Sequence, residues 1–247
     1  MSEFQNKKIF ISGASKGIGF ALAEHLEALG ASLLLHASSE EGMTKLRARF
    51  NAGSHTFWQA DFFTPETFEQ SLVPVLDAFG PLDGFVHCVG IRLRRPINLL
   101  SVSATQQTMT ANFVSYLEVV RIITKRGRFS NGLSIVSISS ISAHSGGASV
   151  SVYAASKAAL ESATRCLAKE LVKKSVRVNT IICGQVETEA YSELMASKEN
   201  STDPVLERQY LGLGTPLGVA KIITFVLSSQ SEFITGQSIP ADGGFLT

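Results

Sequence analysis

Short apolar segments alternate with helical segments along the whole chain, and this alternation is the feature that most restricts the fold. The first cycle is clear: Lys8–Ile11 is an apolar run that ends in a glycine-rich turn, and Ile18–Leu29 follows with apolar residues at helical spacing. That helical segment stops at Gly30, a common residue just past a helix end. Short apolar strands separated by helices predict a parallel sheet covered by helices on both faces.

The later cycles follow the same order. We expect further strands at Leu33–Leu35, Thr56–Gln59, Phe85–His87, Leu133–Ile138, Val176–Ile182 and Gln237–Pro240, and helices over Glu41–Phe50, from Pro65 onward, and over Ser103–Lys125, Val152–Lys173 and Val219–Leu227. We find no repeat, low-complexity tract or linker, so we expect one domain over 1–247. The segment 188–215, with its polar stretch Ala196–Pro204, interrupts the alternation after the sixth strand, where a substrate lid would sit.

Composition excludes several classes of function. The net charge of +1 provides no field that would attract nucleic acid or an acidic membrane. No apolar run is long enough to span a bilayer, and Met1–Lys8 lacks the apolar core of a signal peptide, so we expect a cytoplasmic protein. Cys88, Cys166 and Cys183 are too scattered for a disulfide framework or a metal cluster, and we expect buried free thiols and no metal.

The turn after the first strand carries three glycines and reads Ser12-Gly13-Ala14-Ser15-Lys16-Gly17-Ile18-Gly19. A pyrophosphate needs close approach of the backbone and the positive N-terminal end of a helix, and glycine permits both. Between a strand and a helix, this loop predicts a dinucleotide site, with an ordinary tight turn as the alternative. Its G-x-x-x-G-x-G spacing differs from the generic G-x-G-x-x-G fingerprint.

Tyr153 and Lys157 lie four residues apart in a predicted helix and therefore share a face. An ammonium group beside a tyrosine favours the phenolate, so we expect Lys157 to lower the pKa of Tyr153 from about 10 toward the range useful for acid–base chemistry. The alternative is a surface lysine packed over an aromatic ring. Ser140 ends the strand that precedes this helix, with Ser139 as its rival.

Together these motifs resemble the classical short-chain dehydrogenase/reductase family over the whole chain. The resemblance is carried by the glycine loop, Asp61 after the third strand, His87-Cys88-Val89-Gly90, Asn112, the Ser140–Tyr153–Lys157 set, and the closing Ile234-Thr235-Gly236-Gln237 and Asp242-Gly243-Gly244. It implies a three-layer, doubly wound α/β (Rossmann-like) fold with a seven-stranded parallel sheet in the order 3-2-1-4-5-6-7. It also implies a nicotinamide-dependent oxidoreductase of the EC 1.1.1.- class.

The resemblance implies a role for each site residue. Ser140 would hydrogen-bond the substrate oxygen, Tyr153 would supply the proton in reduction, and Lys157 would bind the nicotinamide ribose. Asn112 would hold a water that links Lys157 to solvent, unless its amide bonds a neighbouring backbone instead. The implied cofactor-binding residues are Gly13, Ser15, Lys16, Gly17, Ile18, Gly19, Ser38, Asp61, Gly90, Tyr153, Lys157, Gly184, Val186 and Thr188.

The end of the second strand bears on which nicotinamide cofactor binds. An acidic residue there would hold the ribose 2′-hydroxyl and repel a 2′-phosphate, but the first acid is Glu40. Lys16 could reach the phosphate as a point charge, and Ser38 and Ser39 could donate hydrogen bonds to it. We therefore expect NADP(H). The alternative is a solvated Lys16, with Glu40 or its neighbour Glu41 on a ribose.

Two positions depart from the family pattern. Cys88 stands where a second asparagine usually braces neighbouring strands, and Cys183-Gly184 replaces Pro-Gly after the sixth strand. A thiol is a weak hydrogen-bond partner and the turn loses the fixed φ of proline, which affects local stability more than chemistry. Neither cysteine has a basic neighbour in sequence, so we do not expect thiol chemistry.

Within the family, the chain is most similar to 3-oxoacyl-[acyl-carrier-protein] reductases, which implies reduction of a ketone in fatty acid biosynthesis. Arginines and lysines after the fourth strand and at the ends of the long helices could receive an acidic carrier protein or could simply be solvated: Arg92, Arg94, Arg95, Arg126, Arg128, Lys173 and Lys174. A reductase of a sugar, polyol or other small ketone is the alternative. Another reaction on the same scaffold and a non-catalytic dinucleotide-binding regulator are further ones.

Self-association is also expected. The helical stretches Thr110–Thr124 and Ala159–Leu171 have more apolar positions than one buried stripe requires. The family usually pairs these helices between subunits, so we expect a homotetramer.

Overall fold

The computed structural model describes residues 2–50, 53–196 and 205–247. Its seven strands are all parallel and form one sheet in the order β3-β2-β1-β4-β5-β6-β7, which confirms the expected fold class and strand order. The strands are β1 (Lys8–Ser12), β2 (Ser32–Ala37), β3 (Thr56–Gln59), β4 (Leu82–His87), β5 (Phe129–Ser140), β6 (Arg177–Cys183) and β7 (Ser238–Ala241).

Helices connect successive strands. The α-helices are α1 (Gly17–Ala28), α2 (Glu40–Arg49), α3 (Phe68–Phe79), α4 (Val102–Met109), α5 (Ser115–Ile123), α6 (Ser142–Ser145), α7 (Ser151–Leu171), α8 (Glu189–Ala196) and α9 (Pro216–Leu227). A π-helical turn, η3 (Thr110–Val114), joins α4 to α5. Short 3-10 turns are η1 (Pro65–Thr67), η2 (Ile97–Leu99), η4 (Val172–Lys174) and η5 (Ser229–Ser231).

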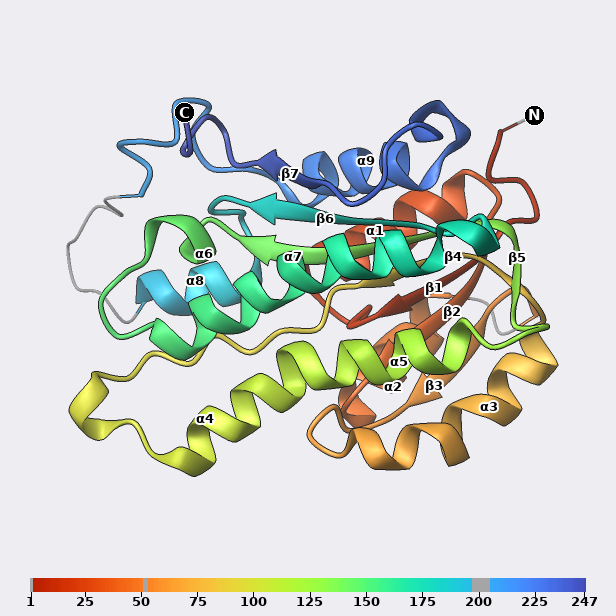
Figure 1. The fold of residues 1–247 in the computed structure, drawn as a ribbon, viewed down its shortest axis with the longest axis horizontal. Helices are drawn as coiled ribbons and strands as arrows, with labels where there is room; N and C mark the ends of the chain where they lie inside the picture. Colours follow the sequence, from red (N-terminus) through yellow and green to blue (C-terminus); the bar gives the residue numbers. More distant parts are fainter. Residues whose placement is uncertain (1, 51–52, 197–204) are drawn as a thin grey trace.

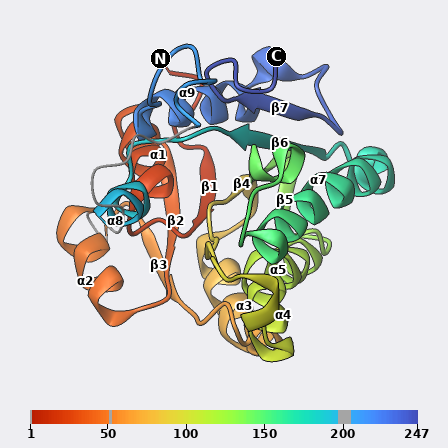
Figure 2. The same ribbon diagram turned by 90° about the vertical axis from the view of Figure 1, so that its left-hand side faces the viewer.

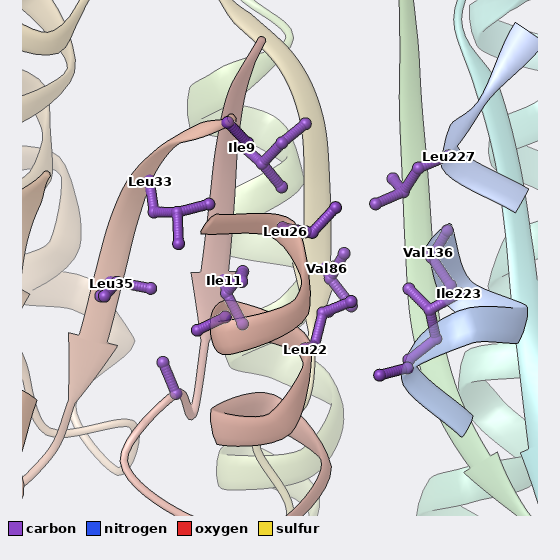
Figure 3. Close-up of a cluster of buried hydrophobic side chains, with 14 of the residues drawn as sticks. Ile9, Ile11, Leu22, Leu26, Leu33, Leu35, Val86, Val136, Ile223 and Leu227 are labelled. Carbon is purple, nitrogen blue, oxygen red and sulfur yellow. The ribbon is translucent and has the colours of Figure 1, made fainter. Parts of the chain in front are cut away.

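The helices form a layer on each face of the sheet (Figures 1 and 2): α1, α2 and α9 cover one face, and α3, α5 and α7 cover the other. Strand β1 explains why the sheet strands read as continuous apolar runs. Ile9 and Ile11 pack in the cluster below α1 and α9, shown in Figure 3, whereas Phe10 between them packs in the cluster on the opposite face. Because successive side chains point to opposite faces and both faces are covered, every position of β1 after Lys8 is buried.

The carboxyl ends of the strands meet at one edge of the sheet, and α6 and α8 lie over that edge (Figure 1). The glycine loop, the end of β5 and the start of the segment 188–215 all come together there. In parallel α/β sheets, ligands bind in the crevice at this edge.

Two local expectations were incomplete and one was wrong. The single long helix expected over Ser103–Lys125 is interrupted by the π-helical turn η3, because Asn112 is drawn toward the loop after β4. The segment after Pro65 begins as a 3-10 turn before α3. Cys166 is exposed on the outer side of α7 rather than buried, whereas Cys183 is buried and Cys88 is half-buried.

Within the described residues, no helix is both long enough and apolar enough to cross a membrane. The same part of the chain contains no group of three or more histidine, cysteine or acidic residues that could hold a metal ion.

Candidate active site

The glycine loop packs so closely that side chains cannot be accommodated at Gly13 and Gly19. Gly13 has φ +72° and Gly17 has φ +55°, both in the left-handed region that favours glycine. A Cβ added at Gly19 would lie 2.2 Å from the carbonyl oxygen of Gly13, and one at Gly13 would lie 3.0 Å from the amide nitrogen of Val89. The N-terminus of α1 therefore follows a loop whose glycines leave the backbone uncovered, which fits the pyrophosphate of a dinucleotide.

A buried histidine holds this loop in place. The amide of Gly13 donates to His36 Nδ1 at 3.0 Å, and His36 Nε2 lies 3.0 Å from the carbonyl oxygen of Ala60. Burial lowers the pKa of His36 to about 4, so the ring is neutral at physiological pH, with its proton on Nε2. Sequence reasoning missed this role, although a polar residue inside the apolar strand 32–37 was a usable signal.

The residues expected around the adenosine end lie at the surface. Lys16 precedes α1 and is exposed, and within the described ranges it forms no ion pair. Ser38 is exposed after β2, and Ser15 lies against the first turn of α2, where a Cβ on Gly42 would come within 3.1 Å of it. The exposed carboxylate of Asp61 accepts a hydrogen bond from the amide of Phe63 at 2.9 Å.

A cavity of about 410 Å³ opens at the carboxyl edge of the sheet. Eight of the predicted site residues line it: Ile18, Gly90, Ser140, Tyr153, Lys157, Gly184, Val186 and Thr188. The remaining ones are not part of its wall: Gly13, Ser15, Lys16, Gly17, Gly19, Ser38, Asp61 and Asn112. The fold thus brings Ser140, Tyr153 and Lys157 together in one cavity beside the glycine loop.

Lys157 lies in an apolar setting one helical turn from Tyr153. Its side chain is buried, and its Nζ donates to the carbonyl oxygen of Ile138 at 2.8 Å. Burial lowers the pKa of Lys157 to about 8. The Nζ atom lies 5.9 Å from the centroid of the Tyr153 ring.

Lys157 was expected to lower the pKa of Tyr153, and this expectation was wrong. Burial raises the pKa of Tyr153 above its ordinary value, and the effects that oppose the increase come from the Ser140 hydroxyl and the positive charge of Arg92. The physical reason is that removal from water outweighs nearby charges here, while the Lys157 ammonium is held by Ile138.

The two candidate serines differ in the hydrogen bonds that their hydroxyl groups form. The Ser139 hydroxyl donates to the buried carboxylate of Glu161 at 2.5 Å, and that carboxylate also meets His144 Nε2 at 2.9 Å. The Ser140 hydroxyl accepts from the amide of Ser142 at 3.2 Å and hydrogen-bonds the Tyr153 hydroxyl, so it is not tied to a buried carboxylate. Ser140 is therefore the better donor toward a bound molecule.

Asn112 is fully buried in the π-helical turn. Its Oδ1 accepts from the amide of Ile91 at 2.8 Å, and its Nδ2 donates to the carbonyl oxygen of Ile91 at 3.0 Å and to Ser156 Oγ at 2.9 Å. The side chain therefore ties the loop after β4 to α7, which is the neighbouring-backbone arrangement considered for this residue.

The two cysteines in the cavity wall are poor nucleophiles. Burial raises the pKa of Cys88 and of Cys183 to about 12, so both remain thiols at neutral pH.

Two contacts from the segment 188–215 reach the cofactor side of the cavity, and sequence reasoning missed both. Glu189 Oε2 accepts from the amide of Gly17 at 3.1 Å. The Gln209 side chain forms two hydrogen bonds with the backbone of Gln185. Its Oε1 accepts from the Gln185 backbone amide at 2.8 Å, and its Nε2 donates to the Gln185 carbonyl oxygen at 2.9 Å. Most of the polar stretch Ala196–Pro204, expected as part of a lid, lies outside the described residues.

Comparison with known proteins agrees with this geometry. A family model described as enoyl-(acyl carrier protein) reductase matches residues 13–246. The 3-oxoacyl-[acyl-carrier-protein] reductase FabG of Vibrio cholerae is 27% identical over 240 residues, covering 97% of each chain. The L-xylulose reductase of Caenorhabditis elegans is 28% identical over 251 residues, covering 98% of this chain and 97% of the relative.

Solved structures match over the full length. A short-chain dehydrogenase/reductase of the glucose/ribitol dehydrogenase type from Brucella melitensis superposes with a TM-score of 0.90 at 29% identity and 99% coverage of both chains. A blue fluorescent protein from a metagenomic library, in complex with NADPH, has a TM-score of 0.90 at 27% identity and full coverage of both. The chain therefore belongs to the short-chain dehydrogenase/reductase family of oxidoreductases.

Proposed function

We propose that this protein reduces a ketone to a secondary alcohol, reversibly, with NADP(H) as the cofactor. The observation that carries the proposal is the convergence of Ser140, Tyr153 and Lys157 in one cavity beside the glycine loop. Reduction of a carbonyl needs a hydride at carbon and a proton at oxygen. The bound cofactor would supply the hydride, so the protein has to orient the carbonyl and supply the proton.

Each proposed catalytic side chain has a distinct task. Ser140 would donate its hydroxyl hydrogen to the carbonyl oxygen, and Tyr153 would transfer its phenolic proton to the same atom. Lys157, with a pKa of about 8, is mostly protonated at neutral pH. Its positive charge would stabilise the phenolate that Tyr153 becomes after giving up its proton. A water at Asn112 would return a proton to Lys157. Both amide hydrogens of Asn112 are already donated, to Ile91 and Ser156. The water would therefore have to donate a hydrogen bond to an oxygen acceptor, such as Asn112 Oδ1 or a nearby backbone carbonyl.

The dinucleotide would be held by residues of the glycine loop and of the strand ends. We assign to it Gly13, Ser15, Lys16, Gly17, Ile18, Gly19, Ser38, Asp61, Gly90, Tyr153, Lys157, Gly184, Val186 and Thr188. Preference for NADPH is supported by the exposed, unpaired Lys16 among the described residues, by the exposed Ser38, and by relatives that bind NADPH.

Equilibrium titration tests the cofactor proposal. NADPH should bind more tightly than NADH, and Lys16→Ala should remove the difference. Equal affinities of the wild-type protein for the two cofactors would contradict it.

For the substrate, we propose a 3-oxoacyl group on an acyl carrier protein, in fatty acid biosynthesis, as suggested by the Vibrio cholerae relative. The second candidate is a small ketone such as a sugar. It is favoured by the Caenorhabditis elegans relative. It is also favoured by the position of Arg92 and Arg94, because both line the cavity itself, whereas arginines that only dock a carrier protein would lie on the outer surface. NADPH oxidation with 3-oxoacyl thioesters and with small ketones distinguishes the two. Reduction of an enoyl double bond alone would overturn both.

We further propose a cytoplasmic homotetramer of single-domain subunits, in which the segment 188–215 closes over the substrate. Thr188, Tyr191 and Val205 line the cavity and support the lid. Apolar side chains exposed on and near the helices support association: Val102, Val114, Leu217, Phe225 and Phe233. Light scattering at micromolar concentration should give four times the subunit mass, and a monomer mass would refute the assembly.

A further inference from the structure

Two arginines from one loop line the cavity. Arg92 and Arg94 belong to the segment between β4 and η2, and both lie in the same wall as Tyr153 and Lys157. The guanidinium carbon of Arg92 lies 6.0 Å from the centroid of the Tyr153 ring. A permanent cation therefore stands beside the tyrosine proposed to protonate the carbonyl.

The backbone that carries these arginines is fixed on both sides. Before Arg92, the amide of Asn112 pairs with both backbone groups of Ile91, at 2.8 and 3.0 Å. After Arg94, the amide of Arg95 donates to the carbonyl oxygen of Ser149 at 2.7 Å. The loop is thus tethered to the helical layer and to the turn before α7, and these tethers direct the arginines toward the cavity.

The positive charge of this wall is not balanced. None of the described residues that line the cavity is acidic, and neither Arg92 nor Arg94 forms an ion pair within the described ranges. The wall also includes the hydroxyls of Ser142 and Ser145 and the glycines at 146 and 147. Guanidinium groups without an ion-pair partner suit an oxyanion, because a guanidinium presents parallel N–H groups that match a carboxylate or a phosphate.

We propose that Arg92, with Arg94 beside it, binds an anionic oxyacid group on the ketone substrate, so that the enzyme selects oxo acids or phosphorylated ketones over neutral ketones. Because Arg92 lies next to Tyr153, the anionic group sits within a few bonds of the reacting carbonyl. The inference rests on the proposed ketone reduction. For the substrate it favours the second candidate, a small ketone, and adds that this ketone carries an anionic group.

Matched substrate pairs test this inference. The rate of NADPH oxidation is measured with a series of short 2- and 3-oxo acids, with their methyl esters, and with small ketones with and without a phosphate. The wild-type enzyme should have kcat/KM at least about tenfold higher for an anionic member than for its neutral partner, in the range of a single guanidinium–oxyanion contact. The oxo acid and phosphate arms show which oxyacid is preferred.

Variants in the same loop assign the preference to a residue. Arg92→Leu should lower kcat/KM for the anionic substrate at least about tenfold, mainly through KM, and change the neutral one less than about threefold. Arg92→Lys should restore part of the loss. Arg95→Leu is the matched control, since Arg95 lies outside the cavity wall, and it should behave as the wild type.

The outcomes separate this inference from the proposed function. If no ketone of either charge oxidises NADPH, the proposed function itself fails. If neutral ketones or neutral carrier-linked acyl chains are reduced as well as anionic ones, the function stands and the inference is overturned. An equal loss in Arg92→Leu for anionic and neutral substrates would also overturn it, because Arg92 would then act only on Tyr153.

Discussion

Replacement of Lys157 by methionine should make the folded protein more stable while abolishing the proposed reductase activity. The Lys157 side chain is 4% exposed, and burial lowers its pKa from 10.5 to about 8. Because the folded pKa lies below the unfolded one, the unfolded chain binds more protons between these values. The free energy of unfolding therefore decreases as the pH falls from 10.5 to 8 and stays low below pH 8.

The shift corresponds to about 3 kcal/mol at neutral pH. Methionine removes this cost and keeps most of the apolar packing. It also loses the hydrogen bond to the Ile138 carbonyl, worth about 1 kcal/mol. We therefore expect Lys157→Met to raise the free energy of unfolding by about 2 kcal/mol at pH 7, which is an exchange of stability for function.

Urea denaturation of the cofactor-free protein at pH 7 and at pH 10 measures the effect. The stabilisation should be present at pH 7 and much smaller at pH 10, where wild-type Lys157 is neutral in the folded state. Lys169→Met, an exposed position on the same helix, is the control and should change stability by less than about 0.5 kcal/mol. Destabilisation of Lys157→Met by the same amount at both pH values would refute the reasoning.

Three further predictions concern the cofactor side. His36 has a pKa of about 4 in the folded state, so the free energy of unfolding should decrease by on the order of 3 kcal/mol as the pH falls from 6.5 to 4. In urea denaturation, the stability of His36→Asn should depend less on pH over this range than that of the wild type. The same pH dependence in both proteins would contradict this. Glu189→Gln should tighten NADPH binding several-fold in a fluorescence titration, because its carboxylate accepts the Gly17 amide that the pyrophosphate needs; unchanged affinity would argue against that competition. Gly19→Ala should weaken NADPH binding at least tenfold, since the new Cβ would lie 2.2 Å from Gly13 O, while the circular dichroism spectrum stays that of the wild type. Binding as tight as in the wild type would contradict this, because it would show that the loop can move to admit the side chain.

The fold was predictable because burial on both faces leaves a strong local signal. Strand β3 was predicted at Thr56–Gln59, its observed bounds, and the other strands differ from prediction mainly at their ends. The alternation predicts a covered parallel sheet, but the strand order came from the family resemblance. Apolar periodicity does not state which strands are neighbours.

The π-helical turn at Asn112 was not predictable in the same way. It depends on the bonds between Asn112 and Ile91, two residues that lie far apart in sequence. The helical periodicity over Ser103–Lys125 predicts which residues form the apolar face. It does not indicate that one turn of the helix is widened to a π-helical turn. Long-range hydrogen bonds of polar side chains are the information that the local pattern lacks.

The electrostatics of the site were also beyond local reasoning. The four-residue spacing places Lys157 beside Tyr153 but does not show how strongly each is buried, and burial determines the direction of both pKa shifts. The arginines after β4 were visible as charges. Their orientation into the cavity depends on the tethers at Ile91 and Arg95.

Transfer of deuterium tests the central claim most directly. The protein is incubated with NADPH carrying deuterium at both C4 positions and with a panel of 3-oxoacyl thioesters, keto sugars and oxo acids, and the products are analysed by mass spectrometry. We predict an alcohol with one deuterium on its carbinol carbon, formed at least about a hundredfold more slowly by Tyr153→Phe, which lacks the proton donor but keeps the ring. Absence of labelled alcohol from every substrate, or equal rates for wild type and Tyr153→Phe, would contradict the account.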